Sequence, residues 1–300
     1  YDVAKEEREV TNNGYTAKIP ADFAVVPGCS DISKGLVISD VSNDTNDQGN
    51  QYVWIPVDGI LEENGTIDDV TGSEKKILLG RYKFADDGTP SKYSGNYSEE
   101  TQEEHTYNNE TATDINGFIQ SVRDNKGYYI ARYEAGVTGY DASNVIKTNS
   151  ESNPDWTGYS EESKGSLKLV SKLGAQAWNY VTQVRASKLC QNLYSGIKSD
   201  LINTYAWDTA ILFIQKYSGD SDYSMQTGYS TTPNALQSTG KGVLEATGEA
   251  DKRCNIYDMA GNCMEWVTET FVNADGRWVY RGGNYNKSSF YTSYRNNNAI

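Results

Sequence analysis

Short apolar runs recur along the chain at the lengths typical of β-strands. β-branched and aromatic residues dominate residues 35–41 (GLVISDV) and 50–57 (NQYVWIPV), with SNDTNDQG between them. Two apolar runs joined by a segment of turn formers predict a β-hairpin. Residues 75–84 (KKILLGRYKF) alternate like a single strand, and residues 127–141 (GYYIARYEAGVTGYD) have a strand-and-turn pattern. These patterns predict small antiparallel sheets.

Helical periodicity is confined to three segments. Residues 166–195 carry apolar residues at spacings of three and four, which predicts one long amphipathic helix. The segment AWDTAILFIQKY, residues 206–217, predicts a second main helix, and a short helix is expected near 115–124 after Asp114. The periodic positions of the long segment are Val170, Leu173, Ala177, Val181 and Val184.

Polar segments set the expected domain limits. Residues 1–14 are charged and are expected to fray, within a lead-in and first strand over residues 1–34. One domain is expected over residues 35–300, with an acidic, Gly-rich polar insertion at about 58–116. We therefore expect an α+β fold with two main helices, small antiparallel sheets and much irregular structure. Further loops are predicted over residues 150–166 and 218–253.

The composition of the chain argues against a protein that binds nucleic acid or spans a membrane. The 300 residues carry a formal net charge of −14, which repels nucleic acid and anionic membrane surfaces. No run of about 18 apolar residues is present that could span a bilayer. The sequence opens on YDVAKEEREV without Met, so we expect a mature or trimmed product whose targeting segment has been removed.

The residues that most often carry catalysis or metals are scarce. The four cysteines, Cys29, Cys190, Cys254 and Cys263, have no CxxC spacing, which argues against zinc and thioredoxin-type sites. Cys254 and Cys263 would pair if their strands were neighbours, but free, partly buried thiols are the favoured interpretation. His105 is the only histidine and is expected to be a solvated loop residue. The loop from Asp44 has Ile55 where a calcium loop needs Glu, so it is interpreted as a turn.

Two short motifs near the end of the chain have a clear backbone interpretation. In YDMAGNCMEW, residues 257–266, the pair Gly261–Asn262 suits a turn that needs positive φ, and Trp266 then enters a strand. In RGGNY, residues 281–285, Gly282 and Gly283 allow another backbone or ring to approach closely. Arg281 is expected to tie the region together through bidentate hydrogen bonds.

These motifs, with three earlier stretches in the same order, resemble the formylglycine-generating-enzyme-like (sulfatase-modifying-factor) domain. The resemblance covers roughly residues 35–298 and implies a variant of the C-type lectin fold. It also implies a calcium ion bound by the carboxylates of Asp258 and Glu265 and the carbonyls of Gly261 and Cys263. A plain turn with Glu265 paired to an arginine is the alternative. The three earlier stretches are IARYEAGVT, AQAWNYVTQV and LINTYAWDTAILF.

Members of the family that the chain resembles have three different functions, and each function needs different residues. Oxidases of this family use two cysteines after the Arg-Gly-Gly strand to bind copper, whereas no cysteine follows Cys263 here. The ergothioneine-type branch binds iron through histidines, and one histidine is too few. We therefore expect no enzyme. The alternative is a copper oxidase that uses Cys254 and Cys263.

The third function is binding without catalysis. Retroelement-diversified variable proteins of similar fold display a C-terminal patch rich in Asn, Tyr and Ser. The same residue types are common in the binding loops of antibodies. The expected ligand is a protein or glycan, or a cell-surface receptor, met outside the cell, on its surface or on a virion. Self-assembly through a preceding pilin-like segment and a structural filament or virion subunit are alternatives, as is a tail whose rings pack inside. The candidate ligand-binding residues are Asn284, Tyr285, Asn286, Ser288, Ser289, Tyr291, Tyr294, Asn296, Asn297 and Asn298.

Overall fold

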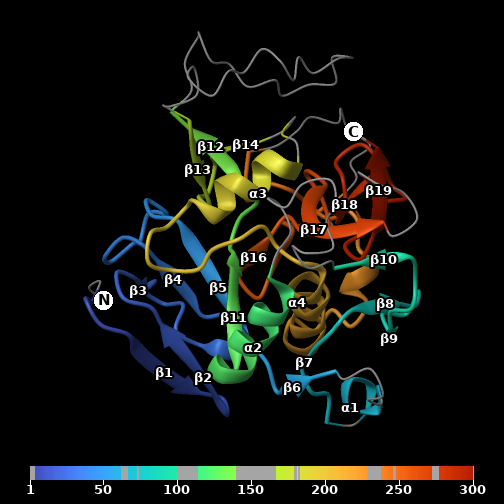
Figure 1. Cartoon of the computed structure of the whole chain (residues 1–300), viewed down its shortest axis with the longest axis horizontal. Coiled ribbons are helices and arrows are strands. Elements are labelled where there is room, and N and C mark those ends of the chain that lie inside the picture. Colours follow the sequence, from blue (N-terminus) through green and yellow to red (C-terminus); the bar gives the residue numbers. More distant parts are fainter. Residues whose placement is uncertain are drawn as a thin grey trace.

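A computed structural model describes most of the chain as a mixed α+β structure of small sheets around one central helix (Figure 1). Helix α4 (Thr204–Tyr217) lies in the middle, with N-terminal sheets on one side and the C-terminal sheet on the other. None of the helices in the described ranges combines the length and the apolar character needed to cross a bilayer. The described residues are 4–61, 67–72, 74–99, 114–139, 167–178, 181, 183–228, 238–245, 248–271 and 277–299.

The first element of the described residues is a hairpin, so the prediction of a frayed start is wrong for residues 8–14, whereas residues 1–3 lie outside the described residues. Strand β1 (Arg8–Asn12) pairs with β2 (Tyr15–Ile19) around Asn13 and Gly14, whose φ angles are 52° and 79°. An Asn-Gly pair with two positive φ values makes the tight turn that antiparallel strands favour. Strand β2 buries Ala17 and Ile19 in a separate core cluster with Trp54, which offsets the polar character of β1.

The predicted hairpin in residues 35–57 is confirmed. Strand β4 (Val37–Ser39) pairs with β5 (Gln51–Pro56), and β3 (Ala24–Val25) and β11 (Gly127–Ala131) complete a four-stranded sheet. In the connecting loop the buried carboxylate of Asp44 accepts hydrogen bonds from Ser39, Gln51 and two backbone amides, as a turn requires. The predicted short helix is also confirmed as α2 (Ile115–Asn125), capped by Asp114.

The single helix predicted over 166–195 is wrong for most of its length. The chain instead forms β13 (Lys168–Val170) and β14 (Gln176–Ala177), which lie on either side of β12 (Gly136–Thr138), and only then helix α3 (Gln183–Gln191). Val170 and Ala177 both lie opposite Gly136 in these strand pairs. A spacing of seven therefore came from two short strands joined by a turn, and it imitates two helical turns.

The predicted polar insertion at 58–116 contributes to the core in its described part. It contains β6 (Gly59–Ile60), helix α1 (Asp68–Thr71) and β7 (Leu78–Leu79), with β6 parallel to β7. The run 75–84 is divided between β7 and β8 (Tyr82–Phe84), which belong to different sheets, so the prediction of one strand is wrong. His105 and its acidic loop lie outside the described residues. The insertion's core side chains are Leu61, Val70, Ile77, Leu78, Leu79, Tyr82 and Phe84.

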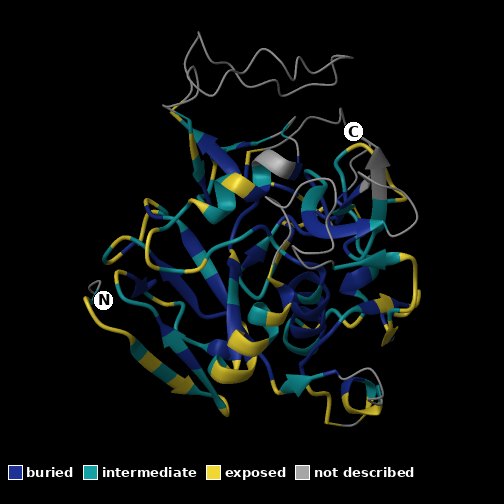
Figure 2. Ribbon diagram, viewed as in Figure 1, coloured by how far each residue is buried: buried dark blue, intermediate teal, exposed yellow. Residues whose placement is uncertain are grey.

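The C-terminal sheet has the order β10–β17–β18–β19 and packs near α4, which is buried along nearly its whole length (Figure 2). The second main helix was predicted from residue 206 and is confirmed. Asn203 caps it by accepting a hydrogen bond from the amide of Ala206. The strands of this sheet are β10 (Tyr97–Ser98), β17 (Glu265–Phe271), β18 (Arg277–Arg281) and β19 (Arg295–Ala299). Elsewhere, β8 pairs with β9 (Pro90–Lys92), and β15 (Lys252–Arg253) pairs with β16 (Ile256–Tyr257). Two short 3-10 helices are η1 (Ile32–Lys34) and η3 (Tyr223–Met225).

Candidate ligand-binding face

Arg281, predicted to tie the C-terminal region together, is fully buried and does so. Its guanidinium donates hydrogen bonds to the carboxylate of Asp208 and the hydroxyl of Thr204, both in helix α4. Its Nε also donates to the carbonyl of Tyr294 at 3.0 Å. Strand β18 is thereby bonded to α4 on one side and to the returning tail on the other.

A second arginine extends this buried charge network. Arg295 donates to Asp208 at 2.9 Å and to Glu269 at 2.8 Å, and Glu269 also pairs with Arg81. The side chains of Asp208 and Glu269 are both 0% exposed. Each of the three arginines meets a carboxylate and each of the two carboxylates meets two arginines, so every charge of the network has an oppositely charged partner.

Glu99 links the strand β10 to the start of helix α4. Its carboxylate accepts hydrogen bonds from the amide of Thr204 and from the hydroxyl of Thr268, both at 2.6 Å. Burial, and then the neighbouring carboxylate of Glu269, raise the pKa of Glu99 to about 7. The residue therefore titrates near neutral pH at the point where the insertion meets the core.

The paired glycines allow the close backbone approach that the sequence predicted. A Cβ at Gly283 would lie 1.7 Å from the carbonyl oxygen of Ala260, and Gly282 has a φ of 85°. In the facing turn Asn262 has a φ of 56°, as expected for the Gly261–Asn262 pair. The two motifs thus contact each other through their backbones, and no side chain can be added at position 283 without a shift.

The segment after the glycines is anchored at both ends. The amide of Tyr285 donates to the carbonyl of Asn262 at 3.1 Å. At the far end Thr292 is fully buried, and its carbonyl accepts a hydrogen bond from the indole of Trp207 at 3.0 Å. Between these anchors residues 286–289 are exposed, so a fixed frame presents a short polar loop.

Five aromatic rings lie together beside this loop, and we call them the tail ring cluster. All five are half-buried. Tyr294 stacks on Phe290 with ring centroids 4.1 Å apart and contacts Tyr291 edge-on at 5.9 Å. Tyr280 lies between Tyr294 and Trp266, at centroid distances of 6.4 Å and 6.0 Å. The cluster is Trp266, Tyr280, Phe290, Tyr291 and Tyr294.

The predicted ligand-binding residues whose side chains are described are all exposed or half-buried, and together with Lys287 and Phe290 we call them the tail face. The rings are partly accessible, neither fully inside nor fully outside. The side chains of Asn297 and Asn298 lie outside the described residues, although their backbones pair with β18. The tail face comprises exposed Asn286, Lys287, Ser288 and Ser289 and half-buried Asn284, Tyr285, Phe290, Tyr291, Tyr294 and Asn296.

Three rings of the cluster were not predicted as part of a binding surface. Trp266 was assigned a structural role only, and Tyr280 and Phe290 were not considered. Trp266 and Asn296 both lie opposite Tyr280 in the strand register. The indole of Trp266 also donates to the carbonyl of Val181 at 2.8 Å, which fixes the ring. The alternation in RWVYR was a usable signal for Tyr280, but the cross-strand register could not be derived from one sequence.

Several carboxylates near the turn of residues 259–262, which we call the MAGN turn, interact electrostatically with one another. Asp258 is fully buried and accepts a hydrogen bond from the amide of Gly242 at 3.0 Å and another from Gly240. Burial and then Asp251 raise the pKa of Asp258 to about 7, and burial and then Asp258 raise that of Glu265 to about 8. Burial and then Asp258 also raise the pKa of Glu134 well above its usual range. In the described part of the chain, no arginine or lysine pairs with these groups.

The predicted calcium ligands fit the ion by donor type. Neither the carboxylate of Glu265 nor the carbonyls of Gly261 and Cys263 take part in a hydrogen bond within the described ranges. Asp258, in contrast, is engaged by backbone amides. No three acidic, cysteine or histidine side chains of the described residues gather as a metal-binding group. The alternative, an ion pair between Glu265 and an arginine, is not seen in that part of the chain.

The cysteines are all free thiols and half-buried. Burial raises the pKa of Cys254 to about 12, and burial followed by the Glu134 carboxylate raises that of Cys263 well above its usual range. The thiolate, not the thiol, is the copper ligand and the nucleophile. The surroundings of both residues therefore disfavour the form that an oxidase would need.

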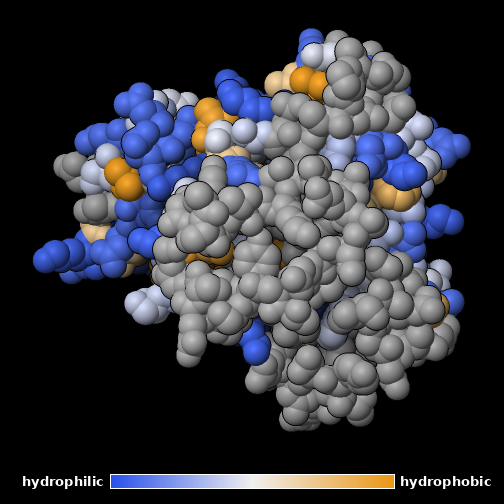
Figure 3. All heavy atoms as spheres, turned by 90° about the horizontal axis from the view of Figure 1, so that it is seen from above, coloured by the Kyte–Doolittle hydropathy of each residue, from blue (hydrophilic) through white to orange (hydrophobic). Residues whose placement is uncertain are grey.

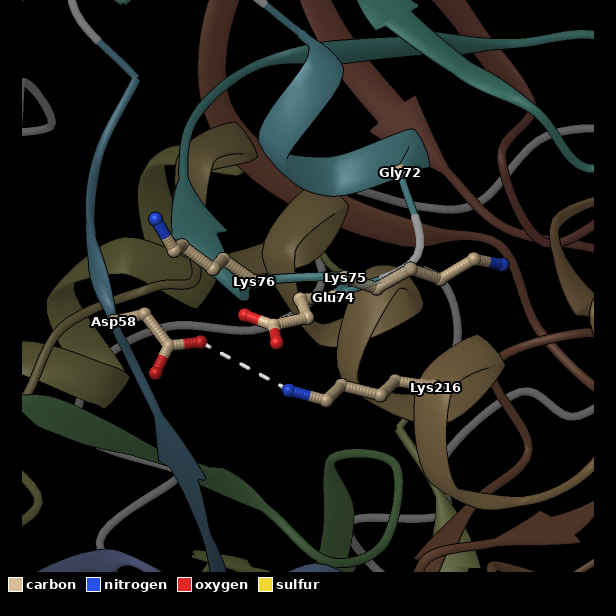
Figure 4. Close-up of a pocket in the computed structure, with 6 residues that line it drawn as sticks. All are labelled: Asp58, Gly72, Glu74, Lys75, Lys76 and Lys216. Carbon is tan, nitrogen blue, oxygen red and sulfur yellow. Dashed lines mark ion pairs between the residues drawn. The ribbon is translucent and has the colours of Figure 1, made fainter.

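An open pocket lies at the other end of the molecule, beside α1, β6 and β7 (Figures 1 and 4). Lys216 faces Asp58 across it at 4.0 Å, whereas the ammonium groups of Lys75 and Lys76 point away (Figure 4). Its charges nearly cancel, and it shares no residue with the tail face. In the view from above, the described residues visible around the grey atoms are mostly hydrophilic, with some hydrophobic residues among them (Figure 3). Comparisons with protein-family models, with curated proteins and with solved structures gave no match.

Proposed function

We propose that this chain is a non-catalytic ligand-binding protein of the formylglycine-generating-enzyme-like type. A lectin-like frame carries the tail face, which contacts a protein or glycan ligand outside the cell, on a cell surface or on a virion. The observation that supports this most directly is the anchored tail: Arg281, Gly283 and Thr292 are buried, while residues 286–289 between them are exposed. A fixed, solvent-accessible loop beside half-buried rings suits recognition, because little conformational entropy is lost on binding.

The chemistry of the tail face supports the same proposal. Tyrosine contributes rigid contact area with a polar tip, and Asn and Ser add adaptable donors and acceptors. Burial raises the pKa of the thiols of Cys254 and Cys263, which weakens the copper oxidase as a competing function. A filament or virion subunit is the second candidate, and it requires the tail face to be covered by a neighbouring copy.

Calcium is proposed as a structural ion at the MAGN turn. Carboxylate and carbonyl oxygens are the ligands that calcium prefers, and Glu265, Gly261 and Cys263 supply such atoms. Asp258 would add a carboxylate next to the amides it already engages. A bound cation would also lower the pKa values of Asp258 and Glu265, which burial and then neighbouring carboxylates raise. The ion would stiffen the turn against which Gly283 rests, and no reaction is assigned to it.

The proposed function is tested with two matched triple variants on arrays of glycans and extracellular proteins. The tail variant replaces exposed Asn286, Ser288 and Ser289 by Ala. The control variant replaces Thr45, Asn46 and Gln48 by Ala, which are likewise exposed and uncharged but lie in the β4–β5 loop. We expect array ligands that bind the wild type and the control variant and lose at least tenfold in affinity for the tail variant. Ligands that bind all three proteins equally would contradict the proposal.

Diversification by a retroelement is a separate part of the proposal. Adenine-directed mutagenesis converts Asn codons into Tyr, Ser, Thr and Asp codons, which matches the tail composition. Sequencing of sibling genes tests it. Substitutions concentrated at residues 284–298, with residues 257–266 unchanged, are expected, and substitutions spread evenly along the gene would contradict it.

A further inference from the structure

Tyrosine faces in this chain repeatedly hold the chain's own cations. The guanidinium carbon of Arg295 lies 3.9 Å from the ring centroid of Tyr93, and that of Arg81 lies 4.7 Å from the same centroid. Lys216 lies 5.1 Å from the centroid of Tyr217. Such contacts are favourable because the ring face is electron-rich. Arg132 over Tyr133 and Tyr257, Lys216 over Tyr15, Lys252 over Tyr257 and Arg281 over Trp207 complete the described set.

The tail ring cluster differs from these rings in its contacts. Its five rings contact one another, and within the described ranges no arginine or lysine lies over any of them. They are nevertheless half-buried and partly open to solvent. In the described part of the chain, these partly accessible rings are therefore left without an internal cation.

The charges around the cluster restrict further the chemical class of ligand that it could bind. Residues 277–300 contain no acidic residue, although the chain as a whole carries a net charge of −14. The carboxylates behind the sheet, Asp208 and Glu269, are 0% exposed and already paired with arginines. The overall field attracts cations, but the tail segment offers no carboxylate with which a cation could form a salt bridge.

This combination favours a cation that needs no hydrogen-bond acceptor. A lysine ammonium has three N–H donors and a guanidinium has five, and burying either against rings leaves donors unpaired. A quaternary ammonium carries the same charge with methyl groups in place of N–H donors. Aromatic clusters are a recurrent means of binding it.

We propose that the tail ring cluster binds the quaternary ammonium group of a choline-type headgroup. This inference rests on the proposed function and names the chemistry that the tail face recognises. Tyr280, in the middle of the cluster, would contact the methyl groups through its face, and Tyr294 would contact them through the face that does not stack on Phe290. Trp266 and Phe290 would close the sides.

The test measures the affinity of choline against 3,3-dimethyl-1-butanol, its uncharged analogue of the same shape. Binding is followed by NMR of protein with carbon-13-labelled Tyr and Phe rings. We expect choline to bind about fivefold to thirtyfold more tightly than the alcohol, as a cation–π contribution implies. The resonances of Tyr280, Tyr294 and Phe290 should shift. Equal affinities, or shifts confined to other rings, would overturn the proposal.

Variants and further ligands separate the proposal from nonspecific attraction to an acidic protein. Tyr280→Leu and Tyr294→Leu, made separately so that one folding failure is not decisive, should each abolish the preference. Tyr257→Leu is the control, because Arg132 and Lys252 already lie over that ring. Ethanolamine that binds as tightly as choline would overturn the proposal. A trimethyl-lysine peptide that binds more tightly than choline would overturn the headgroup as the source.

The two hypotheses fail in different ways. Suppose that an array ligand without a quaternary ammonium group binds through Asn286, Ser288 and Ser289, and that the protein shows no preference for choline over the alcohol. This result would overturn the inference about choline but would leave the proposed function supported. Unchanged binding in the tail variant and in both the Tyr280→Leu and Tyr294→Leu variants would overturn both.

Discussion

The buried charge network makes a sharp prediction about stability, and Asp208→Asn is the most informative change. The substitution keeps the shape of the side chain but removes its charge. Arg281 and Arg295 would then face an amide, and the backbone amide of Tyr82, which donates to Asp208 at 2.8 Å, would lose a charged acceptor. Within the described residues, Arg281 would be left without a carboxylate partner, and Arg295 would keep only Glu269, which also pairs with Arg81.

The size of the effect follows from the burial of the partners. Removing one member of a buried ion pair costs about 3–5 kcal/mol, because an uncompensated charge remains in the dry interior. Domains are stable by only about 5–15 kcal/mol, so this loss is a large fraction of the total. A lowering of the melting temperature by roughly 6–20 °C follows. Because Arg281 also donates to the carbonyl of Tyr294, the tail face should lose order together with the network.

The assay is urea unfolding, with the free energy of unfolding compared between wild type, Asp208→Asn and a control. Asp69→Asn is the control, because it is the same substitution in an exposed pair with Lys76 at 3.4 Å, in which both side chains are about half exposed. Exposed pairs contribute less than about 1 kcal/mol. If Asp208→Asn cost no more than Asp69→Asn, the interior would not be dry and the account of the frame would be refuted.

Three further predictions concern Gly283, Glu99 and the proposed calcium site. Gly283→Ala should lower the free energy of unfolding by at least about 1–3 kcal/mol in urea unfolding, because its Cβ would collide with the carbonyl of Ala260, and an unchanged stability would contradict the close approach. Since the pKa of Glu99 is raised to about 7, the folded state holds the proton more tightly than the unfolded state; this group's contribution to stability is therefore full at about pH 4 and is lost as the pH rises to about 7. Glu99→Gln should flatten that part of the curve of stability against pH, and an unaltered curve would assign the slope to other groups. Calcium should raise the melting temperature at pH 7.5 relative to chelator, Glu265→Gln should remove that rise, and a rise that survives the substitution would place the ion elsewhere.

The sequence predicted the elements whose pattern is local. Helix α2 has its cap in Asp114, helix α4 has a long apolar stripe, and the hairpin of β4 and β5 has a dense turn between two apolar runs. The Arg281 anchor and the close approach at Gly283 were also predictable, because residue type alone restricts what those positions can do.

The errors arose where tertiary pairing outweighed the local pattern. Val170 and Ala177 are seven residues apart and match a helical face, yet they lie opposite Gly136 in two different strand pairs. The hairpin of β1 and β2 looked too polar to order, because its stability comes from Ala17 and Ile19 in a core contributed by distant segments. The tail ring cluster was missed for the same reason: Trp266 and Tyr280 are neighbours only through the register of β17 with β18.

The central claim is that a fixed frame presents the tail face to a ligand, and side-chain footprinting tests it most directly. Hydroxyl radicals would oxidise accessible rings in the protein alone and in complex with a ligand from the arrays. The account predicts protection of Tyr285, Phe290, Tyr291 and Tyr294 on binding, with Tyr194 and Tyr257 unchanged. Protection of Tyr194 or Tyr257, with the four tail residues oxidised as before, would contradict it.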